Sequence, residues 1–182
     1  MKAVLEAHHW RGTTAFVLVL AALGFASRAT FVQLPFLQEV VPARSLIAIG
    51  AAVLLGIPLY GAFAEFAPAL AREPRTRALW LVAAGVVAVA AYAPAAVGVP
   101  DPFARADTVV FMLLASVSVL SVVLIGDRAW IVTLALGFTL TVVGSGPARP
   151  VTSVALHVPA FAVAGCVAAA VAAYLLRGPR RG

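Results

Sequence analysis

Long stretches without any charged residue dominate the hydrophobic pattern of this chain. Each stretch is about as long as the 20 residues that a helix needs to cross the hydrocarbon core of a bilayer. Within them, apolar side chains occupy every helical face instead of alternating with polar ones, which favours helices over the strands of a β-barrel. Five such stretches lack Asp, Glu, Lys and Arg: 45–64, 78–100, 108–126, 129–148 and 150–176.

A sixth apolar stretch near the N-terminus is interrupted by one charge. Residues 12–27 and 29–38 are uncharged, and Arg28 lies between them. We predict one helix from about Thr13 to Leu34, with Arg28 near its far end and its guanidinium reaching the membrane surface. The predicted fold class is therefore an all-α integral membrane protein whose six transmembrane helices occupy residues 13–176.

The composition supports this fold class. Of the 182 residues, 63% are hydrophobic and 11% are charged. Soluble domains average about 45–50% apolar and about 25% charged residues, and disordered chains are poor in apolar residues. The single cysteine, Cys166, excludes an intrachain disulfide.

The basic residues predict how the helices are oriented, because Lys and Arg gather in short cytoplasmic loops. With the N-terminus inside, nine of the 13 basic residues fall on the cytoplasmic side and four outside. Both termini are then cytoplasmic, 177–182 form a basic tail, and the net charge of +6 is explained by anionic headgroups without nucleic acid. A cleaved signal peptide is the alternative for the first span, but the bulky residues after Arg28 make a poor cleavage site.

Two cytoplasmic segments stand apart from the predicted spans. Residues 1–12, MKAVLEAHHWRG, can form an amphipathic interfacial helix, with Trp10 and Arg11 as anchors at headgroup depth. The loop 65–77, EFAPALAREPRTR, is either an ordinary basic loop or a docking segment for a soluble partner. Its charged side chains are Glu65, Arg72, Glu73, Arg75 and Arg77.

Motifs for catalysis are missing from the sequence. It contains no phosphate-binding loop, its only lysine is Lys2, and it contains neither HExxH nor paired Cys and His ligands. We therefore predict no enzyme activity, no cofactor and no metal site. No acidic residue lies at mid-depth in a predicted span, which disfavours an autonomous ion-coupled transporter.

The predicted spans contain only mildly polar side chains and small residues. The hydroxyl residues can hydrogen-bond between helices or line a substrate path, and small residues four apart allow helices to approach closely. The small pairs are Ala22 and Ala26, Ala52 and Gly56, and Gly165 and Ala169. The hydroxyl residues considered for a substrate path are Ser116, Ser118, Ser121 and Thr133.

The order of these elements resembles the membrane (permease) subunits of type-2 ATP-binding-cassette exporters, in their small actinobacterial form. The resemblance is carried by MKAVLEAHHWRG, by PLYGAFAEFAPALAREPRTRALW and by DPFARADTVVFMLLASVSVLSVVLIGDRAW. It implies a cytoplasmic ATPase partner that docks on the Glu65–Arg77 loop. It also implies a homo- or hetero-oligomer in the cell membrane that moves an amphipathic peptide or natural product.

Two other functions are compatible with the same pattern. Substrate-binding subunits of energy-coupling-factor importers also have about six spans and dock through an alanine-rich first helix, which Ala22 and Ala26 fit loosely. A membrane accessory or scaffold protein without a substrate is the second.

Overall fold

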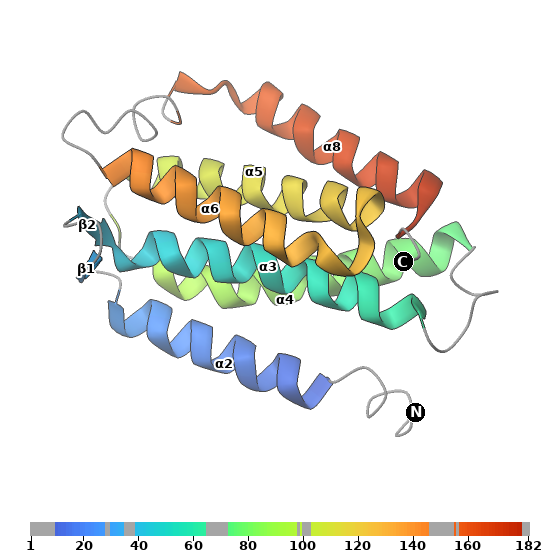
Figure 1. The fold of residues 1–182 in the computed structure, drawn as a ribbon, viewed down its shortest axis with the longest axis horizontal. Coiled ribbons are helices and arrows are strands. Elements are labelled where there is room, and N and C mark those ends of the chain that lie inside the picture. The colour runs from blue at the N-terminus through green and yellow to red at the C-terminus, as the bar shows by residue number, and fades with distance from the viewer. Residues whose placement is uncertain are drawn as a thin grey trace.

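The computed structural model consists almost entirely of long helices that alternate in direction (Figure 1). It describes residues 10–27, 30–34, 39–64, 73–97, 99, 103–145, 155 and 157–179. These residues contain six α-helices of 17 to 23 residues. The helices are α2 (Trp10–Ser27), α3 (Ala43–Ala64), α4 (Pro74–Ala96), α5 (Phe103–Leu124), α6 (Ala129–Ser145) and α8 (Ala160–Arg177), with the short 3-10 helix η2 (Gly126–Arg128) between α5 and α6. The predicted mostly helical fold is confirmed.

Three of the described helices are long and apolar enough to cross a membrane. These are α4, α5 from Ala104 onwards, and α8. The apolar stretches described in α2 and α3, Gly12–Ser27 and Ala43–Leu59, are shorter. Large apolar side chains also cover the outside of the bundle, and Phe161 is 79% exposed. A fold with such an exterior is compatible with a membrane protein, because lipid favours the apolar surface that water disfavours.

The predicted first helix from Thr13 to Leu34 is wrong in its second half. Helix α2 ends at Ser27, and β1 (Phe31–Leu34) pairs antiparallel with β2 (Glu39–Pro42). The Thr30 hydroxyl and backbone N–H both donate to the Ser27 carbonyl, which closes the turn after the helix. Aromatic and β-branched residues then favour strands over a further helical turn. Arg28, which was expected inside this helix, lies outside the described residues.

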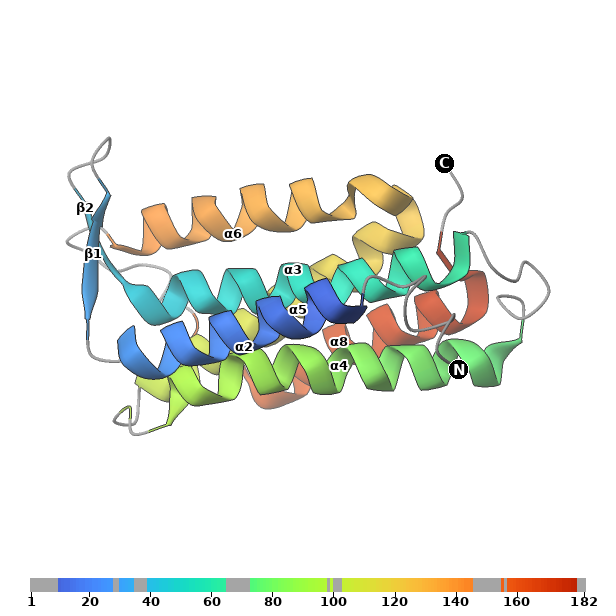
Figure 2. The same ribbon diagram turned by 90° about the horizontal axis from the view of Figure 1, so that it is seen from below.

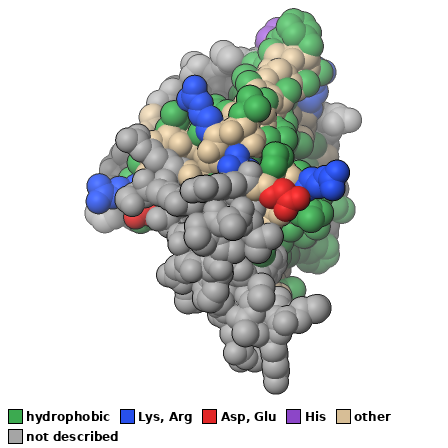
Figure 3. Space-filling view, turned by 90° about the vertical axis from the view of Figure 1, so that its right-hand side faces the viewer, with side chains coloured by type: hydrophobic (Ala, Val, Ile, Leu, Met, Phe, Trp, Pro, Cys, Tyr) green, Lys and Arg blue, Asp and Glu red, His purple; other side chains and the backbone are tan. Residues whose placement is uncertain are grey.

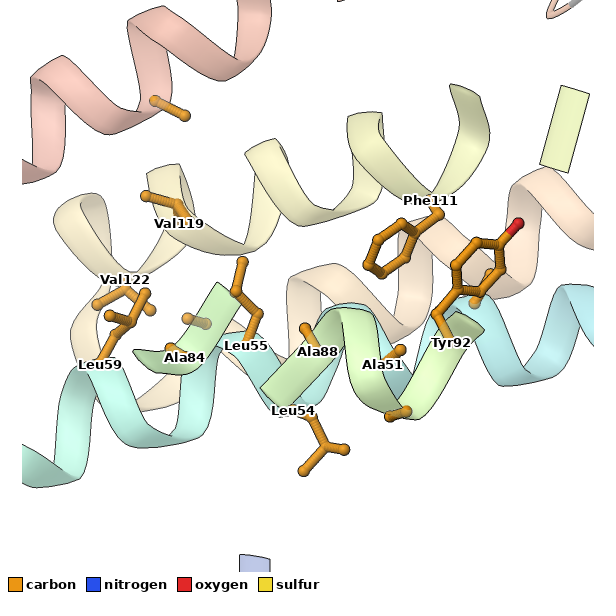
Figure 4. Packing of buried hydrophobic residues seen from close by; sticks show 14 of the residues in the cluster. Ala51, Leu54, Leu55, Leu59, Ala84, Ala88, Tyr92, Phe111, Val119 and Val122 are labelled. Carbon is orange, nitrogen blue, oxygen red and sulfur yellow. The ribbon is translucent and has the colours of Figure 1, made fainter. Parts of the chain in front are cut away.

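The core of the bundle lies around α3. Figures 1 and 2 show α3 in the middle, with α2, α4, α5 and α6 around it, and α8 on the outside against α5. Alanines on one face of α4 pack against fully buried leucines of α3, as Figure 4 shows for Ala84, Ala88 and Leu54. Small side chains on α4 thus let two helices pack closely, as is common in membrane bundles.

Glycines mark the points where two helices approach each other most closely. A Cβ atom added at Gly24 would lie 3.1 Å from the Ala95 Cβ, and one added at Gly56 would lie 2.8 Å from the Ser118 Oγ. Of the predicted small pairs, Ala52 and Gly56 are therefore packing residues between α3 and α5. The other two predicted pairs, on α2 and α8, are exposed on the outside of the bundle.

Candidate functional site

The four hydroxyl residues that the sequence offered for a substrate path all lie inside the bundle. Two of them donate to a carbonyl of their own helix: Ser116 to Met112, at 2.8 Å, and Thr133 to Ala129, at 3.2 Å. Such a bond satisfies the hydroxyl without a partner on another helix. The four residues, which are the buried polar side chains of the described chain, are Ser116, Ser118, Ser121 and Thr133.

Ser118 lies against a neighbouring helix. Its side chain is fully buried against Gly56 of α3, and its Oγ has no hydrogen-bond partner among the described residues. Ser118 therefore lies in a tight contact between α3 and α5 in this structure. A substrate path that includes Ser118 requires that α3 and α5 move apart.

The end of the bundle where α4 begins and α8 ends is rich in arginine. We call it the arginine end and define it by Arg75, Arg77, Arg128 and Arg177. Figure 3 looks onto this end and shows Arg side chains and acidic side chains on a surface that also has hydrophobic side chains.

Three charged side chains of the predicted docking segment are described by the structure. Two are exposed, and the third contacts another helix. Glu73 and Arg75 are exposed at the start of α4. Glu73 precedes the helix in an extended conformation, and its carboxylate accepts a hydrogen bond from the Thr76 hydroxyl at 3.4 Å. Glu65 and Arg72 of the same predicted set lie outside the described residues.

Arg77 reaches the end of α8 instead of the solvent. Its guanidinium Nη1 donates to the Leu175 carbonyl at 2.7 Å, where a helix end leaves carbonyls unpaired and carries a partial negative charge. Gly178 closes α8 with a φ of 71°, and a Cβ there would lie 2.9 Å from the Arg77 Cζ. Arg77 therefore connects the predicted docking segment to the last turn of α8.

Tyr174 adds a second contact at this junction. Its side chain is fully buried in α8, and its hydroxyl donates to the Leu59 carbonyl of α3 at 3.4 Å. The last turn of α8 is thus held by α4 through Arg77 and by α3 through Tyr174.

The opposite end of the bundle contains an ion pair that sequence analysis missed. We call this end the hairpin end, because the β1–β2 hairpin lies there next to the start of α3 and α5 (Figure 1). Arg44 in the first turn of α3 pairs with Asp107 in α5. The two side chains are only 17% and 20% exposed. In the sequence, each residue directly precedes a predicted span, and this was the available hint that the two could pair. The sequence did not show that these two spans are neighbours.

An aromatic pair lies beside this ion pair. The Tyr92 ring of α4 stacks on the Phe111 ring of α5 with centroids 4.4 Å apart and planes inclined by 11° (Figure 4). The ion pair joins α3 to α5 and the stacked rings join α4 to α5, so three helices meet at the hairpin end.

The remaining predicted site residues can be placed only in part. Trp10 and Arg11 form the start of α2, and nothing in the described residues tests their anchoring role. No group of three or more His, Cys, Asp or Glu residues in the described part of the chain could hold a metal ion. Comparisons with protein-family models, with curated proteins and with solved structures give no match.

Proposed function

We propose that the chain is the transmembrane subunit of an ATP-driven exporter, with six membrane spans and both termini in the cytoplasm. The observation that carries the proposal is the unequal charge of the two bundle ends. The arginine end has four arginines beside the exposed Glu73 and Asp127, whereas at the hairpin end Arg44 is paired with Asp107 and Arg105 is the exposed arginine among the described residues. Short basic ends face the cytoplasm, so the arginine end is the side on which a cytoplasmic ATPase meets the bundle.

The proposed coupling segment is 65–77. Glu73 and Arg75 are exposed for contact with the ATPase, and Arg77 links the same segment to α8. Movement of the ATPase is passed to α4 and α8 when its two nucleotide states bind the segment with different affinity, since equal affinity would shift no equilibrium. Separation of α3 from α5 then exposes hydroxyls such as Ser118 to an amphipathic peptide or natural product.

Reversal of a charge in the segment tests this coupling. The variants are Arg72→Glu and Arg75→Glu, and the matched control is Arg128→Glu, which changes an exposed arginine at the same end but outside the segment. The tagged proteins are purified in mild detergent and a co-purifying ATPase is identified by mass spectrometry and nucleotide hydrolysis. We expect the two segment variants to lose the ATPase and the control to keep it. Equal retention by all variants, or wild-type protein without an ATPase, contradicts the proposal.

The orientation has its own test. Single cysteines in a Cys166→Ser background, at Arg75 and at Arg105, are exposed at opposite ends of the bundle. In intact cells, a membrane-impermeant maleimide should label the cysteine at position 105 and spare the one at 75. The reverse pattern would place the arginine end outside.

A second candidate function is supported by the exposed face of α2. Ala22 and Ala26 lie on the outside of the bundle, where a partner membrane protein can reach them. This is the arrangement expected of a substrate-binding subunit of an energy-coupling-factor importer. Ala26→Leu would break such a complex without affecting one that depends on Arg75, so the two variants separate the two functions.

A further inference from the structure

The Arg44–Asp107 pair joins α3 to α5 at the hairpin end. Both residues belong to early turns of their helices, at the hairpin end. Farther along, α3 and α5 are held by the close contact between Gly56 and Ser118. The pair is thus an end contact, and the glycine contact is an interior one.

Two further contacts lie at this end. The Thr108 hydroxyl donates to the Ala104 carbonyl of its own helix, at 2.7 Å. The Tyr92–Phe111 stack joins α4 to α5 but leaves α3 unattached. Of the contacts described here, the ion pair is the one that fastens α3 to α5 by charge.

An ion pair differs from an apolar contact in what happens when water enters. The attraction between two charges is about fourfold weaker in bulk water than at the effective dielectric constant of about 20 near a protein surface. The separated charges are then hydrated, which offsets the lost attraction. An apolar contact has no such compensation, because its separation exposes apolar surface to water. The pair therefore tolerates both a closed, dry arrangement and an open, wet one.

We propose that Arg44 and Asp107 form a latch that closes the hairpin end between α3 and α5, and that its opening admits water and solutes to the bundle from that end. This role rests on the proposed function, because an exporter must open the end opposite to its ATPase. The latch itself is a property of the bundle and can be measured without any ATPase.

Two buried alanines serve as reporters of opening at the two ends. Ala48 lies one helical turn beyond Arg44 in α3 and is 1% exposed, and Ala129 lies at the arginine end and is 3% exposed. Each is changed to cysteine in a Cys166→Ser background. The proteins are reconstituted in phosphatidylcholine–phosphatidylglycerol nanodiscs and treated with a cationic methanethiosulfonate reagent.

The latch is broken by Asp107→Asn or by Arg44→Gln and is rebuilt by the charge swap Arg44→Asp with Asp107→Arg. Arg105→Gln, an exposed change in the same helix, is the matched control. We expect Asp107→Asn to raise the modification rate at position 48 by about tenfold or more and to leave the rate at position 129 unchanged. The charge swap should return the rate at position 48 to within about twofold of the parent protein.

The outcomes separate a latch from an ordinary stabilising pair. Equal acceleration at positions 48 and 129 means general loosening and overturns the proposal, as does an unchanged rate at position 48 in both single variants. If Asp107→Asn does not fold, Arg44→Gln and the charge swap decide the matter by the same rates. Because no ATPase is present, failure of the coupling experiment at Arg75 leaves this result unaffected, and the reverse also holds.

Discussion

Adding one methyl group at Gly56 tests how closely α3 and α5 are packed. In Gly56→Ala the new Cβ would lie 2.8 Å from the Ser118 Oγ and 3.6 Å from the Val122 Cγ2, so the Ser118 side chain or the helices must shift. Overpacking of this kind costs about 1–3 kcal/mol, whereas alanine at an unobstructed helix position gains about 0.5–1 kcal/mol over glycine. We expect Gly56→Ala to be less stable than the parent protein.

Two further variants show whether the contact with Ser118 is the cause. Gly165→Ala is the matched control, because no other atom lies within 4 Å of its added Cβ, and it should be at least as stable as the parent protein. Ser118→Ala removes a buried hydroxyl without a hydrogen-bond partner, so combining it with Gly56→Ala should recover most of the lost stability. Double-mutant analysis isolates the pairwise term.

Unfolding in mixed detergent micelles, followed by circular dichroism, provides the measurement. The reasoning is refuted if Gly56→Ala is as stable as Gly165→Ala, or if Ser118→Ala fails to rescue it. Either result would mean that α3 and α5 are not in close contact at this point.

Two other predictions follow from the arginine end and from α8. Arg77→Ala removes a charge-assisted hydrogen bond to the Leu175 carbonyl and should lower the free energy of unfolding by about 1.5–3 kcal/mol. The control Arg75→Ala, at an exposed position, should change it by less than about 0.5 kcal/mol. Equal losses of stability in a denaturation series would show that Arg77 does not hold α8. Cys166 is exposed on the outside of the bundle, so in nanodiscs it should react with a lipophilic maleimide and resist a charged one, and equal rates would place it in water.

Sequence analysis predicted best those helices whose ends are set by neighbouring residues in the chain. The charge-free stretches 45–64 and 129–148 overlap almost completely with α3 and α6, because an apolar run ends where charged or proline-containing sequence begins. The first span failed for the opposite reason. Residues 29–38 have no charge that would end the predicted helix, whereas Phe31–Leu34 pair with Glu39–Pro42 as a strand.

The contacts at the two bundle ends were beyond the sequence because they join distant residues. Arg77 finds its acceptor 98 residues later in the chain, and Arg44 pairs with Asp107 on a helix two elements away. The count of basic residues on the two sides of the membrane placed Arg77 in the docking loop and Arg44 in a loop on the outer side. It did not indicate that either residue has a partner within the chain. The hydroxyl residues of α5 are buried in the bundle, and their part in a substrate path stays a prediction.

The alternation of the helices has a practical consequence for studying this protein. The start of α2 and the end of α8 lie at the same end of the bundle (Figure 1). Two fluorescent reporters, one fused ahead of residue 10 and one behind residue 179, should therefore be quenched together by a dye added to a single compartment. Removing any one helix would place them in different compartments. Such a pair of fusions shows whether the number of membrane crossings is even or odd. The result does not depend on which way the protein is inserted.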